Sequence, residues 1–254
     1  MKGQNDKDTM PKVLVGTPVY SGKKYITREW INSVLNLTYK NYDVLVVDNG
    51  IKDKEFLDLF KEKGIMVLES YFGKNTIERI LIARQKLYDY ALQNGYDYLF
   101  SVEQDILVPE DILEKLLLSQ KDIIGAPYIV SSHTNEKRRR IDFVVSASKF
   151  EKVIDKLGEV DVNEWYLASE IKEKGVIKVK SCSLGCTLIS TNVLKKIRAR
   201  ADLSLNRADD SYFFQDCLKN EIGVYLDSSL LGKVKHIKDM YDDLQVGGDL
   251  DVRN

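Results

Sequence analysis

The N-terminal part of the chain alternates short β-branched apolar runs with helical patterns, and this alternation restricts the possible folds more than any other feature. The segments KVLVGTPV (12–19) and DVLVVD (43–48) are typical of buried strands that end in turn residues. Between them, residues 25–37 carry apolar side chains at helical spacing and provide the crossover that two parallel strands require. The alternation continues with a helix at 54–63, a strand at 65–69, a helix at 76–93 and a strand at 97–103. This order predicts an α/β fold with a Rossmann-like, mostly parallel central sheet flanked by helices.

The pattern is less regular after about residue 125. A strand near 123–129 precedes a polar and very basic segment at 131–140, which we expect to be a mobile loop. The segment 177–190 is typical of strand pieces broken at Gly185. The other expected elements are a helix with Pro109 in its first turn, helices at 192–200 and 211–220, and strands at 223–226 and 234–237. Because no repeat and no linker rich in Pro, Gly or Ser interrupts the chain, we expect one domain over 12–237 with loose termini at 1–11 and 238–254.

Charge and cysteine content exclude some classes of partner and compartment. The 38 basic and 39 acidic residues leave a formal charge of −1, so no overall field draws the chain to nucleic acid or an anionic membrane. No apolar run approaches the roughly 20 residues that span a bilayer, and residues 1–10 lack the apolar core of a signal peptide. The three cysteines are odd in number and lack C-x-x-C spacing, which favours a reducing compartment. We therefore expect a cytoplasmic protein with no transmembrane segment and no nucleic-acid partner.

The strongest local signal is Glu103-Gln104-Asp105, an acidic pair at the carboxyl end of an apolar strand. Ligands of doubly wound sheets bind beyond the carboxyl ends of the strands. Burying carboxylates there is costly without a cation, and paired carboxylate oxygens suit Mg²⁺ or Mn²⁺ held together with substrate phosphates. The alternative is an ordinary acidic turn before a helix, whose N-terminus favours negative charge.

Three further positions admit two readings each. Asp209-Asp210 precedes a helical segment, where an acid either caps the helix or acts as a general base beside a metal site. Arg84 falls on the apolar stripe of helix 76–93, so its charge either reaches the rim or pairs with carboxylates at the strand ends. His236 lies in a short apolar strand and is either a structural residue or a ligand.

Taken together, the order of these pieces resembles the GT-A glycosyltransferases, and especially glycosyltransferase family 2, over roughly residues 12–237. The resemblance implies a nucleotide-sugar-binding half at 12–125 and an acceptor-side half at 126–237. Thr17-Pro18-Val19-Tyr20 corresponds to the loop that contacts the donor's base, and Asp48 in VVDNG to the acid that contacts base or ribose. Ala83-Arg84-Gln85 is similar to the A-R-N-like sequence of the helix before the metal motif.

The resemblance also assigns roles to the acidic residues. Glu103-Gln104-Asp105 corresponds to the D-x-D metal motif with Glu in its first position, so Asp105 is the firmer metal ligand, with Glu103 beside it and Gln104 among the donor-binding residues. Asp209-Asp210 resembles the E-D pair whose second acid is the usual base, which indicates Asp210. His236 is placed like a late histidine that serves some GT-A enzymes as a metal or diphosphate ligand, and Gly185 like the glycine of the acceptor-side segment.

The implied activity is a Mn²⁺- or Mg²⁺-dependent, hexosyltransferase-like reaction. It moves a sugar from a UDP- or GDP-sugar to a hydroxyl of a glycan, lipid-linked or protein acceptor, with inversion expected and retention left open. The basic segment 131–140 is either a lid over the donor or a solvated loop. Gly16-Thr17-Pro18 at the end of the first strand disfavours a Mg²⁺-dependent nuclease or phosphotransferase, and the missing G-x-G-x-x-G disfavours a dinucleotide-dependent oxidoreductase. The Gly-rich loop that is typical of a sugar-nucleotide-forming nucleotidyltransferase is missing from this sequence. Glu at position 103 leaves a non-catalytic nucleotide- or glycan-binding module as an alternative.

Overall fold

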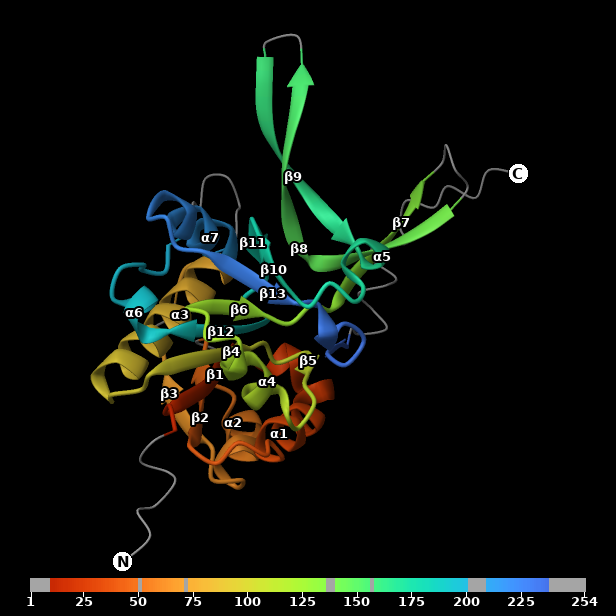
Figure 1. Cartoon of the computed structure of the whole chain (residues 1–254). Helices are drawn as coiled ribbons and strands as arrows, with labels where there is room; N and C mark the ends of the chain where they lie inside the picture. Colours follow the sequence, from red (N-terminus) through yellow and green to blue (C-terminus); the bar gives the residue numbers. More distant parts are fainter. Residues whose placement is uncertain are drawn as a thin grey trace, which may run out of the picture.

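The chain folds around one mixed eight-stranded sheet, seen here in a computed structural model that describes residues 10–49, 52–70, 73–135, 140–155, 158–200 and 209–237 (Figure 1). The strand order is β10-β13-β6-β12-β4-β1-β2-β3. Their bounds are β1 Val13–Val19, β2 Tyr42–Asp48, β3 Met66–Glu69, β4 Tyr98–Val102, β6 Ile123–Gly125, β10 Val176–Val179, β12 Cys186–Ser190 and β13 Val224–Asp227. Four of the seven neighbouring pairs are parallel, which confirms the predicted α/β class with a mostly parallel sheet.

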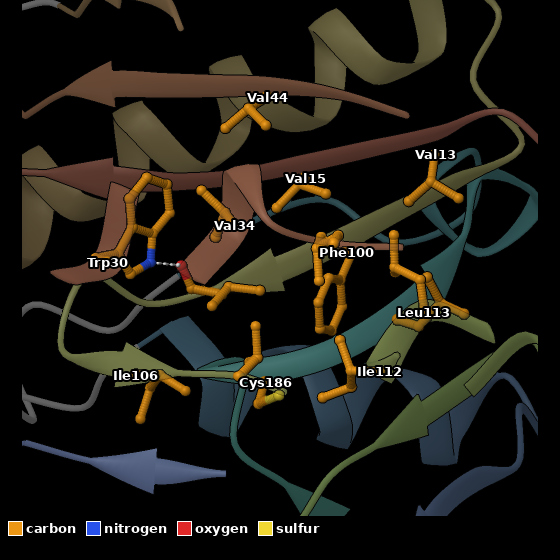
Figure 2. Close-up of a cluster of buried hydrophobic side chains, with 14 of the residues drawn as sticks. Val13, Val15, Trp30, Val34, Val44, Phe100, Ile106, Ile112, Leu113 and Cys186 are labelled. Atoms are coloured by element: carbon orange, nitrogen blue, oxygen red, sulfur yellow. Dashed lines mark hydrogen bonds between the residues drawn. The ribbon is translucent and has the colours of Figure 1, made fainter. Parts of the chain in front are cut away.

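Helices cover both faces of this sheet (Figure 1). One face packs against α1 (Thr27–Leu35), α2 (Lys54–Lys61) and α4 (Ile112–Leu118), and the other against α3 (Thr76–Gln93), α6 (Thr191–Leu194) and α7 (Asp209–Lys219). Strand β1 shows how alternation separates the two cores, since Val13 and Val15 join the first cluster and Leu14 the second. In the first cluster the Trp30 indole donates a hydrogen bond of 3.2 Å to the Val102 carbonyl (Figure 2).

Side-chain caps and one glycine determine where the first helices begin and how closely they pack. The Asp53 side chain accepts from the Phe56 amide and starts α2, and the Asn75 side chain accepts from the Glu78 amide and starts α3. A Cβ added to Gly16 would lie 2.6 Å from Leu87 Cδ1 and 2.9 Å from the Leu45 carbonyl oxygen. The glycine therefore lets α3 approach β1 closely.

The predicted elements of the first half are confirmed, with two local differences. The expected helix at 25–37 begins as a 3₁₀ helix, η2 (Ser21–Ile26), before α1 starts. Pro109 lies before α4 rather than within its first turn, because β5 (Ile106–Leu107) first pairs antiparallel with β14 (Lys235–His236). Sequence spacing alone does not reveal such a two-residue pairing with a segment far along the chain.

The second half differs more from expectation. The segment 131–140 is not a loop up to residue 135, since β7 (Ile129–Asn135) pairs antiparallel with β8 (Arg140–Asp155); residues 136–139 lie outside the described ranges. Strand β8 continues into a long hairpin with β9 (Gly158–Leu167), which projects away from the sheet (Figure 1). The dense charges of this region hide its strand alternation. The remaining short elements are α5 Ala168–Ile171, β11 Ser181–Cys182 and η3 Ser228–Leu230.

The ends of the domain and its cysteines complete the fold. Met10 and Pro11, within the expected N-terminal tail, accept hydrogen bonds of 2.8 Å from the Asn41 amide and 2.6 Å from the Tyr39 hydroxyl. The rest of the expected tails, 1–9 and 238–254, lies outside the described residues. All three cysteines are free and buried. Among the described helices, none combines the length and apolarity needed to cross a bilayer.

Candidate functional site

A cavity of about 180 Å³ opens at the carboxyl ends of β1, β2 and β4, where the doubly wound pattern places a ligand. A larger hollow of about 450 Å³ lies beside α1 and β5, but no strand of the central sheet contributes to it. The smaller cavity collects polar groups from β1, η2 and α3 and from the ends of β2 and β4. Its lining residues are Thr17, Pro18, Tyr20, Lys23, Asn49, Ile80, Arg84, Glu103 and Gln104.

Gln104 ties the segment after β1 to the end of β4. Its Oε1 accepts from the Tyr20 amide at 3.1 Å, and its Nε2 donates to Thr27 Oγ1 at 2.8 Å and to the Lys23 carbonyl at 3.3 Å. The residue is only 2% exposed. Although it lines the cavity, its amide is committed to the protein, so Gln104 positions η2.

Asp105 is a buried carboxylate with two unlike oxygens. Its Oδ2 receives the Lys23 ammonium and lies 3.4 Å from His236 Nε2, whereas its Oδ1 is buried and has no hydrogen-bond partner. Burial by itself raises the pKa of this carboxyl, but the hydrogen bond from His236 and the charge of Lys23 lower it to about 2. Asp105 is therefore ionised at neutral pH, and its Oδ1 accepts no hydrogen bond from the described residues.

The structure brings two of the three predicted metal ligands together. His236 faces Asp105, and its Nδ1 is a second buried atom without a partner. Glu103 turns instead toward Arg84, with 3.3 Å between its Oε1 and Arg84 Nη2. Within the described ranges, no group of three or more His, Cys, Asp or Glu residues converges on one point.

These donors suit a cation that the substrate helps to hold. Mg²⁺ typically takes one or two carboxylates and completes its shell with water and substrate phosphates. The unpartnered Asp105 Oδ1 is an oxygen of that kind, and a buried acceptor without a donor is costly unless a cation or a ligand satisfies it. The residues present therefore fit Mg²⁺ or Mn²⁺ bound jointly with phosphate oxygens.

Arg84 pairs with a carboxylate at a strand end rather than reaching the rim, so the first of these two possibilities is confirmed. It is 2% exposed, and its guanidinium donates to Ser101 Oγ at 3.1 Å and to Glu103 Oε1 at 3.3 Å. Ser101 Oγ in turn donates a hydrogen bond of 2.6 Å to the Leu184 carbonyl. Burial raises the pKa of Glu103, Arg84 opposes the rise, and the charges of Asp105 and Asp210 add to it. Arg84 thus stabilises the ionised form of a carboxylate that burial disfavours.

The cavity lining contains most of the residues expected to contact the donor's base. Thr17, Pro18 and Tyr20 line it, whereas Val19 is fully buried in the core. Asp48 is 1% exposed and accepts a hydrogen bond of 3.0 Å from the Lys52 amide.

Sequence reasoning missed three lining residues: Asn49, Ile80 and Lys23. Asn49 directly follows Asp48 at the strand end, which is a usable signal, and its buried Oδ1 has no partner. Ile80 faces the cavity from the first turns of α3. Lys23 lies in a turn-like stretch, SGKKYI, that carries no comparable signal.

The acidic pair lies at the start of α7. Asp210 is half-buried, and its charge adds to the rise in the pKa of Glu103, so the two carboxylates are electrostatic neighbours. The backbone of Asp209 begins the helix, and its side chain lies outside what the structure describes. The fold therefore brings Asp210 within electrostatic range of Glu103.

Comparison with known proteins identifies the family of the chain. Residues 14–198 match the family described as Glycosyl transferase family 2, a match that covers most of the chain and all of the strands around the cavity from β1 to β4. The chain belongs to glycosyl transferase family 2. It is a family 2 glycosyltransferase with the expected GT-A fold.

Individual relatives of this family 2 glycosyltransferase are distant or short matches. An uncharacterized glycosyltransferase of Rickettsia typhi is 50% identical over 44 residues, which covers 17% of this chain and 14% of the relative's length. S. aureus TarS 1–349, solved in complex with UDP-GlcNAc, aligns with 90% of this chain and 59% of its own at a TM-score of 0.53 and 14% identity. A197 from STIV aligns over 90% of this chain and 86% of its own at a TM-score of 0.44 and 16% identity. The TarS likeness supports the fold.

Replacing Gly185 with alanine is expected to disturb the site of this family 2 glycosyltransferase. The added Cβ would lie 2.2 Å from the Tyr128 hydroxyl and 3.3 Å from Glu103 Oε2. Tyr128 is buried and donates to Ser183 Oγ at 2.8 Å, so its displacement breaks that bond. We expect a loss of about 1–3 kcal/mol, which for a domain of this size lowers Tm by several degrees, together with weaker nucleotide binding.

The matched control is Gly64→Ala, measured by thermal unfolding and nucleotide titration. Gly64 has a φ of +74° and nothing near its added Cβ, so alanine there costs stability through backbone strain alone. We expect nucleotide affinity to be unchanged in this variant. Unaltered Tm and affinity in Gly185→Ala would contradict the close approach of Gly185, Tyr128 and Glu103.

Proposed function

We propose that the chain transfers a sugar from a UDP- or GDP-linked donor to a hydroxyl of a glycan, lipid-linked or protein acceptor, with the help of Mn²⁺ or Mg²⁺. The observation that carries the proposal is the buried, unpartnered Oδ1 of Asp105. It lies just past β4, beside the cavity of about 180 Å³, and the charge of Asp210 acts on the nearby Glu103. Membership of family 2 supports the reaction class.

The donor's nucleoside is expected at the end of the cavity formed by Thr17, Pro18, Tyr20 and Asn49. The unpartnered Asn49 Oδ1 can accept a hydrogen bond from a donor group of the base or the ribose. Such a bond is favoured because a buried acceptor without a partner is costly. Asp48 assists indirectly by holding the Lys52 amide beside the end of β2. The TarS complex with UDP-GlcNAc makes UDP the first nucleotide to test.

The diphosphate is placed beside Asp105 and His236, which adjoin the cavity through the lining residue Lys23. Asp105, with its unpartnered Oδ1, and the neighbouring His236 are the residues that would hold the cation, which would supply neutralisation of charge on the departing nucleotide. Arg84 pairs with Glu103 beside the site and favours its ionised form, whereas burial raises the pKa of Glu103. The Arg84–Glu103 pair is therefore a fixed electrostatic element of the site.

Proton removal from the acceptor is the role proposed for Asp210. It is a half-buried carboxylate at the start of α7, in electrostatic contact with Glu103. A carboxylate at the edge of the site can accept the hydroxyl proton as the oxygen attacks the anomeric carbon. Attack opposite the leaving nucleotide gives inversion. Asp209 is proposed as its accessory neighbour.

The test of this function is a thermal-shift panel of UDP, GDP, CDP, TDP and ADP, each with Mn²⁺, Mg²⁺ or EDTA. A ligand that binds only the native state at about 100 times its Kd adds about 2.7 kcal/mol to stability. We expect a shift of several degrees with UDP or GDP that requires the metal. Absence of a shift with every nucleotide would reject a nucleotide-sugar site in this cavity.

A further inference from the structure

Lys23 is a cationic side chain that lines the cavity and contacts Asp105, beside the proposed diphosphate position. Among the described residues lining the cavity, the cations are Lys23 and Arg84. Arg84 is committed to Ser101 and Glu103, and its side chain is 3% exposed. The Lys23 side chain keeps 26% exposure, while the Asp105 side chain that it contacts keeps 10%. The ammonium thus faces both a desolvated carboxylate and open cavity.

The backbone of Lys23 is held by the acidic motif itself. Its carbonyl accepts from Thr27 Oγ1 at 3.0 Å and from Gln104 Nε2 at 3.3 Å, while Gln104 Oε1 accepts from the Tyr20 amide. Lys23 also departs from helical geometry within η2, with φ −100° and ψ 24°. The middle residue of Glu103-Gln104-Asp105 therefore aims Lys23 at the motif's last residue.

The two carboxylate oxygens of Asp105 have different surroundings. Lys23 and His236 occupy Oδ2, and the buried Oδ1 stays without a partner. A divalent ion on Oδ1 would share one carboxylate with an ammonium, and the two like charges repel unless an anion lies between them. A diphosphate supplies that anion.

We propose that Lys23 is a resident counter-ion of Asp105 that makes metal binding depend on the donor's diphosphate. Without nucleotide, Lys23 neutralises Asp105 and weakens its attraction for a free divalent ion. With nucleotide, the ammonium contacts the diphosphate from one side while the metal contacts it from the other. The metal and the nucleotide then bind cooperatively, each raising the affinity for the other by the same factor. This inference rests on the proposed function, because it assigns a residue to the same site.

The test measures Mn²⁺ binding and UDP binding separately, by calorimetry, in wild type and Lys23→Met; GDP replaces UDP if it is the nucleotide that stabilises the wild type. Removing the ammonium is expected to tighten Mn²⁺ binding in the absence of nucleotide by about tenfold and to weaken UDP binding in EDTA by about tenfold. Lys23→Arg keeps the charge and is expected to bind free Mn²⁺ as weakly as wild type. Lys24→Met is the matched control, because Lys24 is the exposed neighbour in the same segment, and both of its affinities should equal those of wild type.

Tighter Mn²⁺ and weaker UDP in Lys23→Met alone support the counter-ion role. Unchanged or weaker binding of Mn²⁺ alone overturns it, and so does unchanged binding of UDP in EDTA, provided that the wild type binds UDP with Mn²⁺. If the wild type binds neither nucleotide, the proposed function fails first. Thermal unfolding of each variant confirms that it is folded before its affinities are compared.

Discussion

Replacing Asp210 with asparagine is expected to lower turnover by about 10²–10⁴-fold, the usual contribution of a general base, while folding and nucleotide binding stay intact. The asparagine keeps the size of the side chain and an oxygen that can accept from the Ser211 amide, which lies 2.7 Å from Asp210 Oδ1. It cannot accept the proton of an attacking hydroxyl. Sugar transfer under single-turnover conditions, with the nucleotide-induced thermal shift as a check on binding, separates the two effects.

The same helix offers a matched control. Asp216→Asn makes the same chemical change in α7, but Asp216 forms a surface ion pair with Arg200, with both contacts at 2.6 Å. That variant is expected to lose a little stability and to keep its turnover. Asp209→Asn is expected to reduce turnover less than Asp210→Asn does. Wild-type turnover in Asp210→Asn would remove Asp210 from the mechanism.

The largest effect on stability is expected from Arg84→Met. This substitution removes the buried arginine of the pair; breaking a fully buried pair costs about 3–5 kcal/mol, and we expect about 3 kcal/mol because the Glu103 side chain left behind is 36% exposed. For a domain of this size that lowers Tm by roughly 10 °C. Methionine fills part of the volume, so the loss reports mainly the unpaired Glu103 and the lost bond to Ser101.

The deficit should also depend on pH. Burial raises the pKa of Glu103, and Arg84 opposes that rise, so Arg84→Met raises the folded-state pKa further. A carboxyl whose folded pKa exceeds its unfolded pKa binds more protons when folded, and stability then falls as pH rises through that interval. The Tm difference from wild type is therefore expected to be larger at pH 7.5 than at pH 5.

Arg198→Met provides the comparison for that measurement. Arg198 pairs with Asp89 at 3.0 Å, but its side chain is 61% exposed, and exposed pairs contribute about 0–1 kcal/mol. We expect a small Tm change without pH dependence in this range. If both arginine variants lost equally little stability, Arg84 would be a peripheral residue rather than a buried support of Glu103.

Sequence patterns anticipated the fold where local signals and tertiary packing agree. Helix α3 begins and ends at the predicted residues because Asn75 caps it and its apolar stripe covers β1. Because Arg84 falls on this apolar stripe, its charge needs a partner there, and the sequence already pointed to carboxylates at the strand ends. The hairpin β8–β9 was missed because charged residues obscure its alternation.

Within the site, the unpredicted parts depend on contacts distant in sequence. Lys23 reaches Asp105 because Gln104 binds the Tyr20 amide and the Lys23 carbonyl, a link across about eighty positions that no local pattern records. Glu103 was expected beside Asp105 as a metal ligand, but its neighbour in the motif does not fix its direction. The buried Arg84 attracts it to the opposite side.

Strand β12 determines how this enzyme can move. It lies antiparallel between β4 and β6, so a strand from the second half of the chain is hydrogen-bonded into the middle of the sheet. The Glu103 amide itself donates to the Gly185 carbonyl at 2.9 Å, which ties the end of β4 to the residue before β12. Swinging one half of the chain away from the other would break the sheet through its centre, so any opening that keeps the sheet intact is limited to the elements around it.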